Sequence, residues 1–235
     1  MDSQNTNQQL TIEDIDMSLL KLGKVKRVVK LFYGDKPVTF TTNKMFIPFG
    51  VKIYNSDWSS FTNCHIDCSL FISSNPKSQK VLELTEKLGD RVCDLIYENL
   101  GMFNAVDKFE SVNEVKEVFN PIFKKNENYP DLTKISLPRD SKGNFDLVIF
   151  DKDKQKVPLN DNNITTVLSK GIVFKGIVEC SKVWFYNGRF GTMWNLQQMR
   201  LYDNKKQQQR GEEEELTENL VKKESVYGKL MIDED

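Results

Sequence analysis

The pattern of hydrophobic and polar positions is clearest between Gly171 and Tyr202, where two long alternating runs flank an Asn187-Gly188 pair. Asn-Gly is the strongest short signal for a β-hairpin, because both residues accept positive φ angles. Alternation in the second run breaks at Gln197 and Gln198. Such a break suggests a β-bulge, which is common where a sheet curls into a barrel. The sequence therefore predicts two long paired strands joined by a tight turn.

The same hairpin is rich in aromatic and basic side chains. Its aromatic residues are Phe174, Trp184, Phe185, Tyr186, Phe190, Trp194 and Tyr202. The basic residues between them are Lys175, Lys182, Arg189 and Arg200. Flat rings with cations between them suit a single-stranded nucleic acid, because bases stack on rings and the charged backbone follows a positive groove. The alternative, that each ring belongs to the core, stays open because aromatic residues supply much of the burial energy.

Two shorter alternating segments precede a helical region. In residues 45–54, the face that we expect to be buried carries Met45, Ile47, Phe49, Val51 and Ile53. The opposite face carries Phe46, Lys52 and Tyr54, with Lys44 just before the strand. In residues 64–73, the residues expected to point outward are His65, Asp67, Ser69 and Phe71. Pro48 cannot donate a backbone hydrogen bond, which predicts an edge or a bulge at that position.

Helical spacing is found at three places. A short helix is predicted over residues 11–22, where apolar positions share one face. A long helix is predicted over residues 76–100, with a proline in its first turn and Gly101 as the residue that ends it. Ser111 has capping-box spacing to a glutamate three residues later, so a second helix is expected to begin there and to stop before Pro121.

Strands return after the helical region, at residues 132–137 and 145–150. Short strands around one helical insert fit a Greek-key barrel better than a parallel sheet. We therefore predict a mainly β (α+β) fold, an OB-fold-like Greek-key barrel with a long helical insertion and a disordered acidic C-terminal tail. The predicted divisions are a polar N-terminal arm (1–24), an OB-fold domain (25–203) with a helical insert (76–120), and a flexible acidic tail (204–235).

The distribution of charge distinguishes the tail from the body of the chain. The whole sequence has a net charge of −1. Residues 204–235 carry six Lys or Arg and nine Asp or Glu, a net charge of −3, which leaves +2 for residues 1–203. A mildly basic body with an acidic tail is compatible with a phosphate-binding groove.

No motif predicts catalysis or a metal site. His65 is the only histidine, and on a strand it points away from Cys64, so the two cannot share a metal ion. Asp151 and Asp153 fit a turn better than a nuclease carboxylate pair. Neither a P-loop nor a dinucleotide-binding glycine motif occurs. We therefore expect no enzymatic activity, no metal and no cofactor.

Cysteine usage and hydropathy bear on the compartment. The four cysteines form no disulfide framework in a chain of 235 residues. No apolar run resembles a secretory signal or a membrane span. We therefore expect a protein that is not secreted, does not enter a membrane, and works in a reducing compartment.

Four blocks of sequence carry a resemblance to a known family: MFIPFGVKIY (45–54), CHIDCSLFI (64–72), YPDLTKISLP (129–138) and the hairpin (171–201). The most distinctive parts are the PFGV run (48–51), the FG pair (190–191) and the run from Trp194 to Gln197. The blocks and their order cover roughly residues 36–202. They resemble the single-stranded DNA-binding proteins of nucleo-cytoplasmic large DNA viruses, which are similar to the replication single-stranded DNA-binding proteins of short-tailed phages.

The resemblance implies an OB fold, sequence-independent binding of single-stranded DNA, and no enzymatic activity. It also implies a role in DNA replication, recombination and repair, in the host cytoplasm (a viral factory) or the nucleus. The acidic tail would contact replication proteins, such as a polymerase or a helicase-primase, and compete with DNA for the groove. The tail residues concerned are Glu212, Glu213, Glu214, Glu215, Asp233, Glu234 and Asp235. A homodimer is left open.

The resemblance and the pattern of outward rings and cations together predict which residues contact DNA. Bases would stack on Phe46, Tyr54, Trp184 and Tyr186. The backbone would be followed by Lys44, Lys52, Lys175, Lys182, Arg189 and Arg200. Two alternatives remain: an RNA-binding or nucleocapsid-type protein with the same stacking chemistry, and an interaction module whose aromatic residues bind a peptide.

Overall fold

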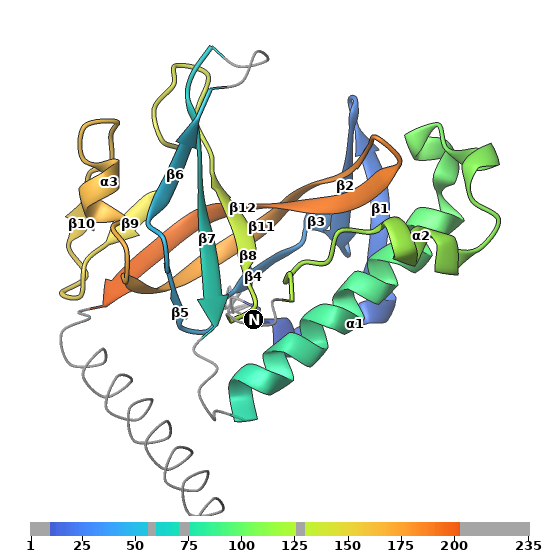
Figure 1. Ribbon diagram of the computed structural model, residues 1–235, viewed down its shortest axis with the longest axis horizontal. Coiled ribbons are helices and arrows are strands. Elements are labelled where there is room, and N and C mark those ends of the chain that lie inside the picture. The colour runs from blue at the N-terminus through green and yellow to red at the C-terminus, as the bar shows by residue number, and fades with distance from the viewer. Residues whose placement is uncertain (1–9, 56–59, 71–75, 126–129, 203–235) are drawn as a thin grey trace, which may run out of the picture. The chain divides into compact units, whose positions relative to one another are not determined.

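The computed structural model describes residues 10–55, 60–70, 76–125 and 130–202 (Figure 1). Three parts of the sequence-based predictions lie outside these described residues. They are residues 1–9 of the predicted arm, Phe71 of the strand predicted over residues 64–73, and the acidic tail (204–235).

Five strands close on one another to form a barrel. The longest are β11 (Val173–Tyr186) and β12 (Arg189–Tyr202), which form the predicted hairpin and cross the middle of Figure 1. β11 also pairs with β5 (Met45–Phe46), and β5 pairs with β7 (Asn63–Leu70). The ring closes through β8 (Thr133–Leu137), which is antiparallel to β7 and parallel to β12.

This closure is that of an OB fold, a five-stranded and partly open Greek-key barrel. The predicted fold class, mainly β with an OB-fold-like barrel and a long helical insertion, is confirmed. The other strands extend the sheet outward from the ring. They are β1 (Leu20–Val25), β2 (Val28–Tyr33), β3 (Lys36–Pro37), β4 (Thr39–Thr41), β6 (Val51–Tyr54), β9 (Val148–Phe150) and β10 (Lys156–Val157).

The hairpin between β11 and β12 forms as the sequence predicts. Asn187 and Gly188 have φ angles of 49° and 74°, the left-handed values that a tight two-residue turn needs. The pairing register shifts between Ile177 and Val178, opposite the predicted break at Gln197. A second shift, between Cys180 and Lys182, was not predicted, although the buried positions change parity there, from Val178 and Cys180 to Val183.

Three helices and four 3-10 turns complete the described structure. The helices are α1 (Pro76–Glu98), α2 (Val112–Val118) and α3 (Ile164–Val167). The 3-10 turns are η1 (Ile12–Asp14), η2 (Met17–Leu19), η3 (Leu100–Phe103) and η4 (Val106–Lys108). The two predicted helices of the insert are confirmed, and the Ser111 hydroxyl accepts the Glu114 backbone N–H at 3.4 Å as its cap. The prediction that Gly101 ends α1 is wrong, because η3 continues the coil and Asn104 takes the left-handed position.

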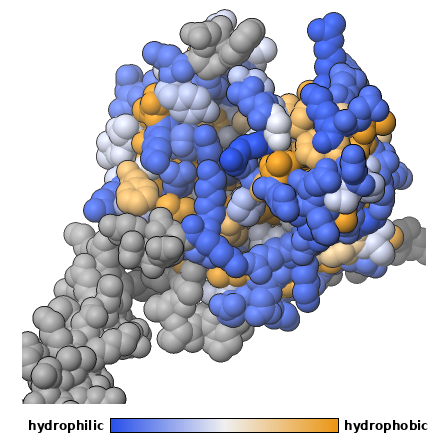
Figure 2. All heavy atoms as spheres, turned by 45° about the vertical axis from the view of Figure 1, so that its right-hand side comes forward, coloured by the Kyte–Doolittle hydropathy of each residue, from blue (hydrophilic) through white to orange (hydrophobic). Residues whose placement is uncertain are grey.

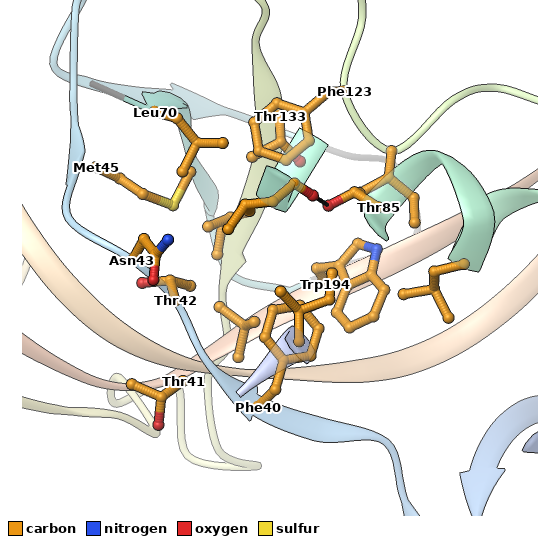
Figure 3. A pocket seen from close by; sticks show the side chains of 16 residues that line it. Phe40, Thr41, Thr42, Asn43, Met45, Leu70, Thr85, Phe123, Thr133 and Trp194 are labelled. Atoms are coloured by element: carbon orange, nitrogen blue, oxygen red, sulfur yellow. Dashed lines mark hydrogen bonds between the residues drawn. The ribbon is translucent and has the colours of Figure 1, made fainter. Parts of the chain in front are cut away.

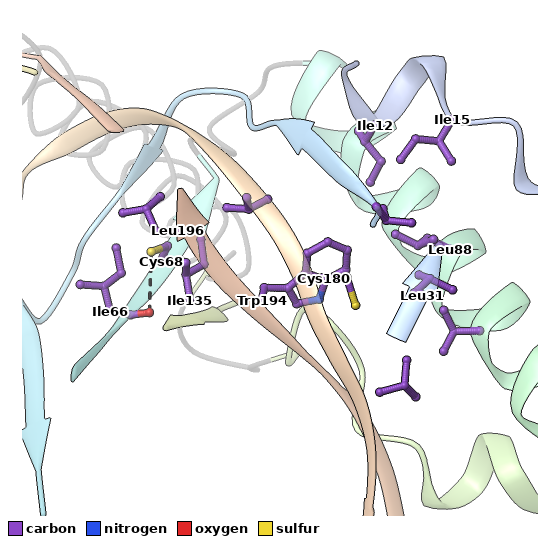
Figure 4. Packing of buried hydrophobic residues seen from close by; sticks show 14 of the residues in the cluster. Ile12, Ile15, Leu31, Ile66, Cys68, Leu88, Ile135, Cys180, Trp194 and Leu196 are labelled. Carbon is purple, nitrogen blue, oxygen red and sulfur yellow. Dashed lines mark hydrogen bonds between the residues drawn. The ribbon is translucent and has the colours of Figure 1, made fainter. Parts of the chain in front are cut away.

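Helix α1 closes one end of the barrel. Val81 and Leu88 of α1 line a narrow apolar cavity of about 40 Å³ together with Met45, Ile135 and Trp194 of the barrel. Figure 3 shows Thr85 of α1, Met45 and Trp194 around this cavity. Figure 4 shows the core on both sides of Trp194, with Ile66, Cys68 and Ile135 in the barrel and Leu31 and Leu88 toward the helix. Burial on two sides makes Trp194 a core residue, and its ring N–H donates to the Thr192 hydroxyl at 2.9 Å.

The predicted helix over residues 11–22 is wrong. The chain makes two single turns and then enters β1, where Leu20 and Leu22 are buried against the core. Only the local capping chemistry of a helix start is present, since the Asp14 carboxylate accepts the Thr11 backbone N–H at 2.8 Å. The sheet therefore begins at Leu20, five residues before the domain start predicted at residue 25.

The single strand predicted over residues 45–54 is also wrong, because it is split into β5 and β6. Pro48 donates no backbone hydrogen bond, and Gly50 has a φ angle of +75°, so the chain turns between the two strands. The expected inward face ends at this turn. Phe49 and Ile53, predicted to be buried, are 55% and 46% exposed.

Candidate nucleic-acid interface

A row of side chains crosses the outer face of the barrel. The strand registers place Lys52 of β6 opposite His65 of β7, His65 opposite Ser136 of β8, and Ser136 opposite Asn195 of β12. The row ends at Glu179 of β11. Residues that face each other in neighbouring strands lie about 5 Å apart. Five strands thus supply one continuous polar row.

Aromatic rings and cations alternate beside this row. The Lys134 ammonium of β8 lies 5.4 Å from the centroid of the Tyr54 ring, and Tyr54 meets the His65 ring edge-on at 5.3 Å. Tyr54 is 41% exposed, so its free ring surface is open to a ligand. An open ring with a cation beside it is the arrangement on which single-stranded bases stack.

Positive charge exceeds negative charge at this place. Asp67 forms an ion pair with Lys52, and its Oδ1 atom lies 3.9 Å from His65 Nε2. Burial lowers the pKa of Lys134, and the cations Lys124 and Lys52 lower it further against the opposing effect of Asp67. Burial also lowers the pKa of His65, as do Lys134 and Lys52. An anion placed among these groups would relieve the repulsion between the lysines.

A pocket continues the positive region toward the hairpin. Its volume is about 520 Å³, and its lining includes Lys124, Lys125, Lys134 and Trp184. We call it the cationic pocket. Lys125 forms an ion pair with Glu86 at 2.8 Å, and Glu86 is outside the lining of this pocket. Trp184 lies on the outer face of β11, opposite Gly191 of β12, and one side of its ring covers that glycine.

The structure separates the ten predicted DNA-contacting residues into groups. Lys52 lies on the polar row, Tyr54 lies beside it, and Trp184 lies at the cationic pocket. Nearer the turn of the hairpin, Tyr186 is 71% exposed, and it pairs with Arg189. Lys182 pairs with Met193 and lies along β11 between Trp184 and the polar row.

The remaining four predicted residues lie at the opposite end of the hairpin. Lys44 and Arg200 approach the Tyr202 ring, at 4.6 Å and 5.3 Å from its centroid. Lys175 pairs with Arg200 across the hairpin, and Phe46 pairs with Val173 and Ser69. Lys175 and Trp184 are nine positions apart along β11, roughly 30 Å. The ten residues therefore form no single cluster, and their contact with DNA stays a prediction.

Sequence reasoning missed Lys124, Lys134, Ser136 and Asn195. The alternation of residues 133–137 was a usable signal, because it places Lys134 and Ser136 on the face opposite the buried Ile135. His65 and Ser69 were predicted to point outward into solvent. That expectation is wrong in exposure, since His65 is 9% and Ser69 is 0% exposed.

Other chemistry finds little support in the described parts of the chain. All four cysteines are free and buried, and burial raises the pKa of Cys93 and of Cys180 to about 12, so neither is a ready nucleophile. Residues 10–55, 60–70, 76–125 and 130–202 hold no group of three or more His, Cys, Asp or Glu side chains suited to a metal ion. The Asp151 carboxylate accepts the N–H groups of Asp153 and Gln155, which is turn chemistry. None of the described helices has the length and apolar character to cross a membrane.

Comparisons with known proteins give a weak structural likeness. No protein-family model and no curated protein matches the sequence. Among solved structures, the chain is similar to the single-stranded DNA-binding protein of bacteriophage Enc34 in complex with single-stranded DNA, with 10% identity and a TM-score of 0.44 over 79% of this chain and 95% of that one. A second structure of the single-stranded DNA-binding protein of bacteriophage Enc34 gives 9% identity and a TM-score of 0.46 over 79% of this chain and 90% of that one, and its C-terminal truncation gives 9% and 0.45 over 80% and 97%. At such identities and TM-scores, the function of this chain has to be argued from its own residues.

Proposed function

We propose that this protein binds single-stranded DNA on the outer face of its barrel, along the polar row and into the cationic pocket. The observation that carries the proposal is the position of Lys134. Its ammonium lies beside the exposed ring of Tyr54 and also lines the pocket that contains Trp184. One cation between two accessible rings offers a phosphate site with a stacking surface on each side.

The placement of the face within the fold supports the same ligand. In OB folds, the face of the second and third barrel strands and the flanking loops bind oligonucleotides and oligosaccharides. In the ring described above, β7 and β8 occupy those positions, and both Lys134 and His65 lie on their outer face. Rings surrounded by lysines favour an anionic polymer of aromatic units over a neutral sugar chain.

Stacking on rings and ion pairing with phosphates depend little on the identity of the bases. Binding of this kind therefore has little sequence preference, and it does not alter the DNA strand chemically. We therefore propose a non-enzymatic role in viral DNA replication and recombination, in the host cytoplasm or nucleus. The acidic tail, with Glu212–Glu215 and Asp233–Asp235, would recruit replication proteins and compete with DNA for the positive face. Deleting residues 204–235 should then tighten DNA binding, and unchanged affinity would remove the competition from the proposal.

The direct test is a titration of the protein with oligo-dT, followed by tryptophan fluorescence at two salt concentrations. We expect quenching, because a base stacked on Trp184 would contact the indole, whereas Trp194 is only 4% exposed. Affinity should fall with salt at a slope near −0.7 per neutralised phosphate. If a Trp184→Phe variant binds oligo-dT with the same affinity but shows no quenching, the signal of the unaltered protein comes from Trp184. No binding at low salt would contradict the proposal, and stronger binding of a matched RNA oligomer would favour the RNA alternative.

A further inference from the structure

A second pocket opens on the same outer face, on the side of the polar row away from the cationic pocket. Its volume is about 330 Å³, and its lining includes Tyr54, Phe61, Ser136, Met193 and Asn195. We call it the neutral pocket. In contrast to the cationic pocket, its lining contains no lysine. Two exposed rings and a flexible thioether supply apolar surface there, beside polar groups such as Asn63, Ser136 and Asn195.

The rim of the neutral pocket is held in place by an arginine clamp. Arg139 donates to the backbone oxygens of Thr62 at 2.9 Å and Gly143 at 2.6 Å, and it forms an ion pair with Asp161. Phe61 packs so closely on Gly143 that a Cβ atom there would collide with the ring. Phe61 nevertheless keeps 40% of its surface exposed. The ring is therefore positioned before any ligand arrives, which lowers the entropic cost of binding.

The inner wall of the neutral pocket carries an unsatisfied acceptor. The side-chain oxygen of Asn195 is buried and accepts no hydrogen bond from any described residue. Leaving a buried acceptor unpaired is costly, so a donor from a ligand would be favoured there. Met193 lines the pocket on the same strand, and its unbranched side chain can change rotamer to admit that donor.

We propose that the neutral pocket takes one unstacked base of the bound strand, and that Asn195 accepts a hydrogen bond from the exocyclic amino group of cytosine or adenine. This inference rests on the proposed function. Lys134 and Ser136 are two positions apart on β8, about 7 Å, so a strand held at Lys134 presents a base to the pocket beside Ser136. Thymine offers a carbonyl where cytosine offers an amino group, and two acceptors repel. A modest preference for amino-bearing bases is thus added to binding that is otherwise independent of sequence.

The test compares the affinities of the full chain for oligo-dC and oligo-dT of equal length. We expect oligo-dC to bind about three- to tenfold tighter, the effect of one net hydrogen bond. In Asn195→Leu, the ratio of the oligo-dC affinity to the oligo-dT affinity should fall to near one, because the acceptor for the cytosine amino group is gone. The matched control is Gln197→Leu on the same strand, because the Gln197 amide already has Glu179 as its partner at 3.5 Å. That control should keep the preference.

A change in the ligand covers the case in which Asn195→Leu does not fold. Replacing the cytosines by 2-pyrimidinone removes the amino group without adding bulk, and the advantage over oligo-dT should then disappear for the unaltered protein. Equal affinity for oligo-dC and oligo-dT, a preference for oligo-dT, or a preference that survives both changes would overturn the assignment of Asn195 and leave the proposed function standing. Failure to bind any of these oligomers would overturn both.

Discussion

The indole of Trp184 lies over Gly191 on the neighbouring strand, and it fills the space that a Cβ atom at position 191 would need. One side of the ring is thereby covered by backbone, and the position of the other side is fixed. Figure 2 shows hydrophobic side chains only in small areas between hydrophilic ones on the face drawn there. A base can stack on a ring held against a glycine at low entropic cost, because the Trp184 side chain is already ordered before the DNA binds.

Gly191→Ala should therefore displace Trp184 and weaken oligo-dT binding. The added methyl group meets the ring itself, so either the ring or the strand has to move. We expect an affinity loss of about 1–3 kcal/mol, the contribution of one stacked base, measured by fluorescence anisotropy of a labelled oligomer. The matched control is Gly188→Ala at the hairpin turn, where no atom lies within 4 Å of the new Cβ. It should lower stability by about 1–2 kcal/mol, because Gly188 has a φ angle of 74°, and leave the affinity of the folded protein unchanged.

Tyr54→Ala and Trp184→Ala should separate stacking from folding. Each variant should lose about 1–3 kcal/mol of binding free energy with little change in melting temperature, because Tyr54 is half-exposed and Trp184 lies on an outer face. Trp194→Ala should do the reverse and lose about 3–5 kcal/mol of stability, because that ring is buried in the core. Calorimetric unfolding and oligomer titration of the three variants make the comparison. Loss of folding in Tyr54→Ala would move that ring from the interface to the core.

The sequence predicts the elements whose determinants are local. The turn at Asn187 and Gly188, the break at Gln197 and the long helix α1 all follow from residues within a few positions of one another. The interface depends instead on pairings between distant segments. Lys134 and Tyr54 are 80 positions apart and meet only because β6 and β8 both flank β7. Periodicity shows which face a side chain takes, but it does not show which strands share that face.

Exposure was harder to predict than direction for the same reason. His65 points outward as alternation requires, yet the rings and lysines of neighbouring strands cover it. Conversely, Phe49 and Ile53 follow a buried pattern and are exposed, since the turn at Pro48 and Gly50 removes them from the barrel. Neither outcome can be obtained from one strand considered alone.

Lys134→Gln should reduce the salt dependence of DNA binding. If Lys134 neutralises one phosphate, the slope of log affinity against log salt should become shallower by about 0.7, and the affinity at low salt should fall. Lys80→Gln is the matched control, because Lys80 is an exposed lysine of α1, outside the polar row and both pockets. Its slope should equal that of the unaltered protein. A slope unchanged in Lys134→Gln would place the phosphates elsewhere on the molecule.

His65 should make the folded protein less stable in mild acid. Burial and the cations Lys134 and Lys52 lower its pKa below the ordinary value of 6.5, and Asp67 opposes them only in part. Between the lowered pKa and about 6.5 the unfolded chain binds more protons at this residue than the folded chain does, so stability falls as pH falls through that window. Above 6.5 both states hold a neutral imidazole, and the effect vanishes.

Since His65 is the only histidine, a single variant isolates the contribution. His65→Gln keeps a polar side chain that does not titrate, and urea unfolding midpoints measured from pH 7.5 to pH 5.5 should change less with pH than those of the unaltered protein. Protonation of His65 would also add a cation beside Lys134, so a bound phosphate should oppose the acid effect, and oligo-dT should reduce the difference between the two proteins. Greater stability of the unaltered protein at pH 5.5 than at pH 7.5 would mean that Asp67 outweighs the burial of His65 and the two lysines.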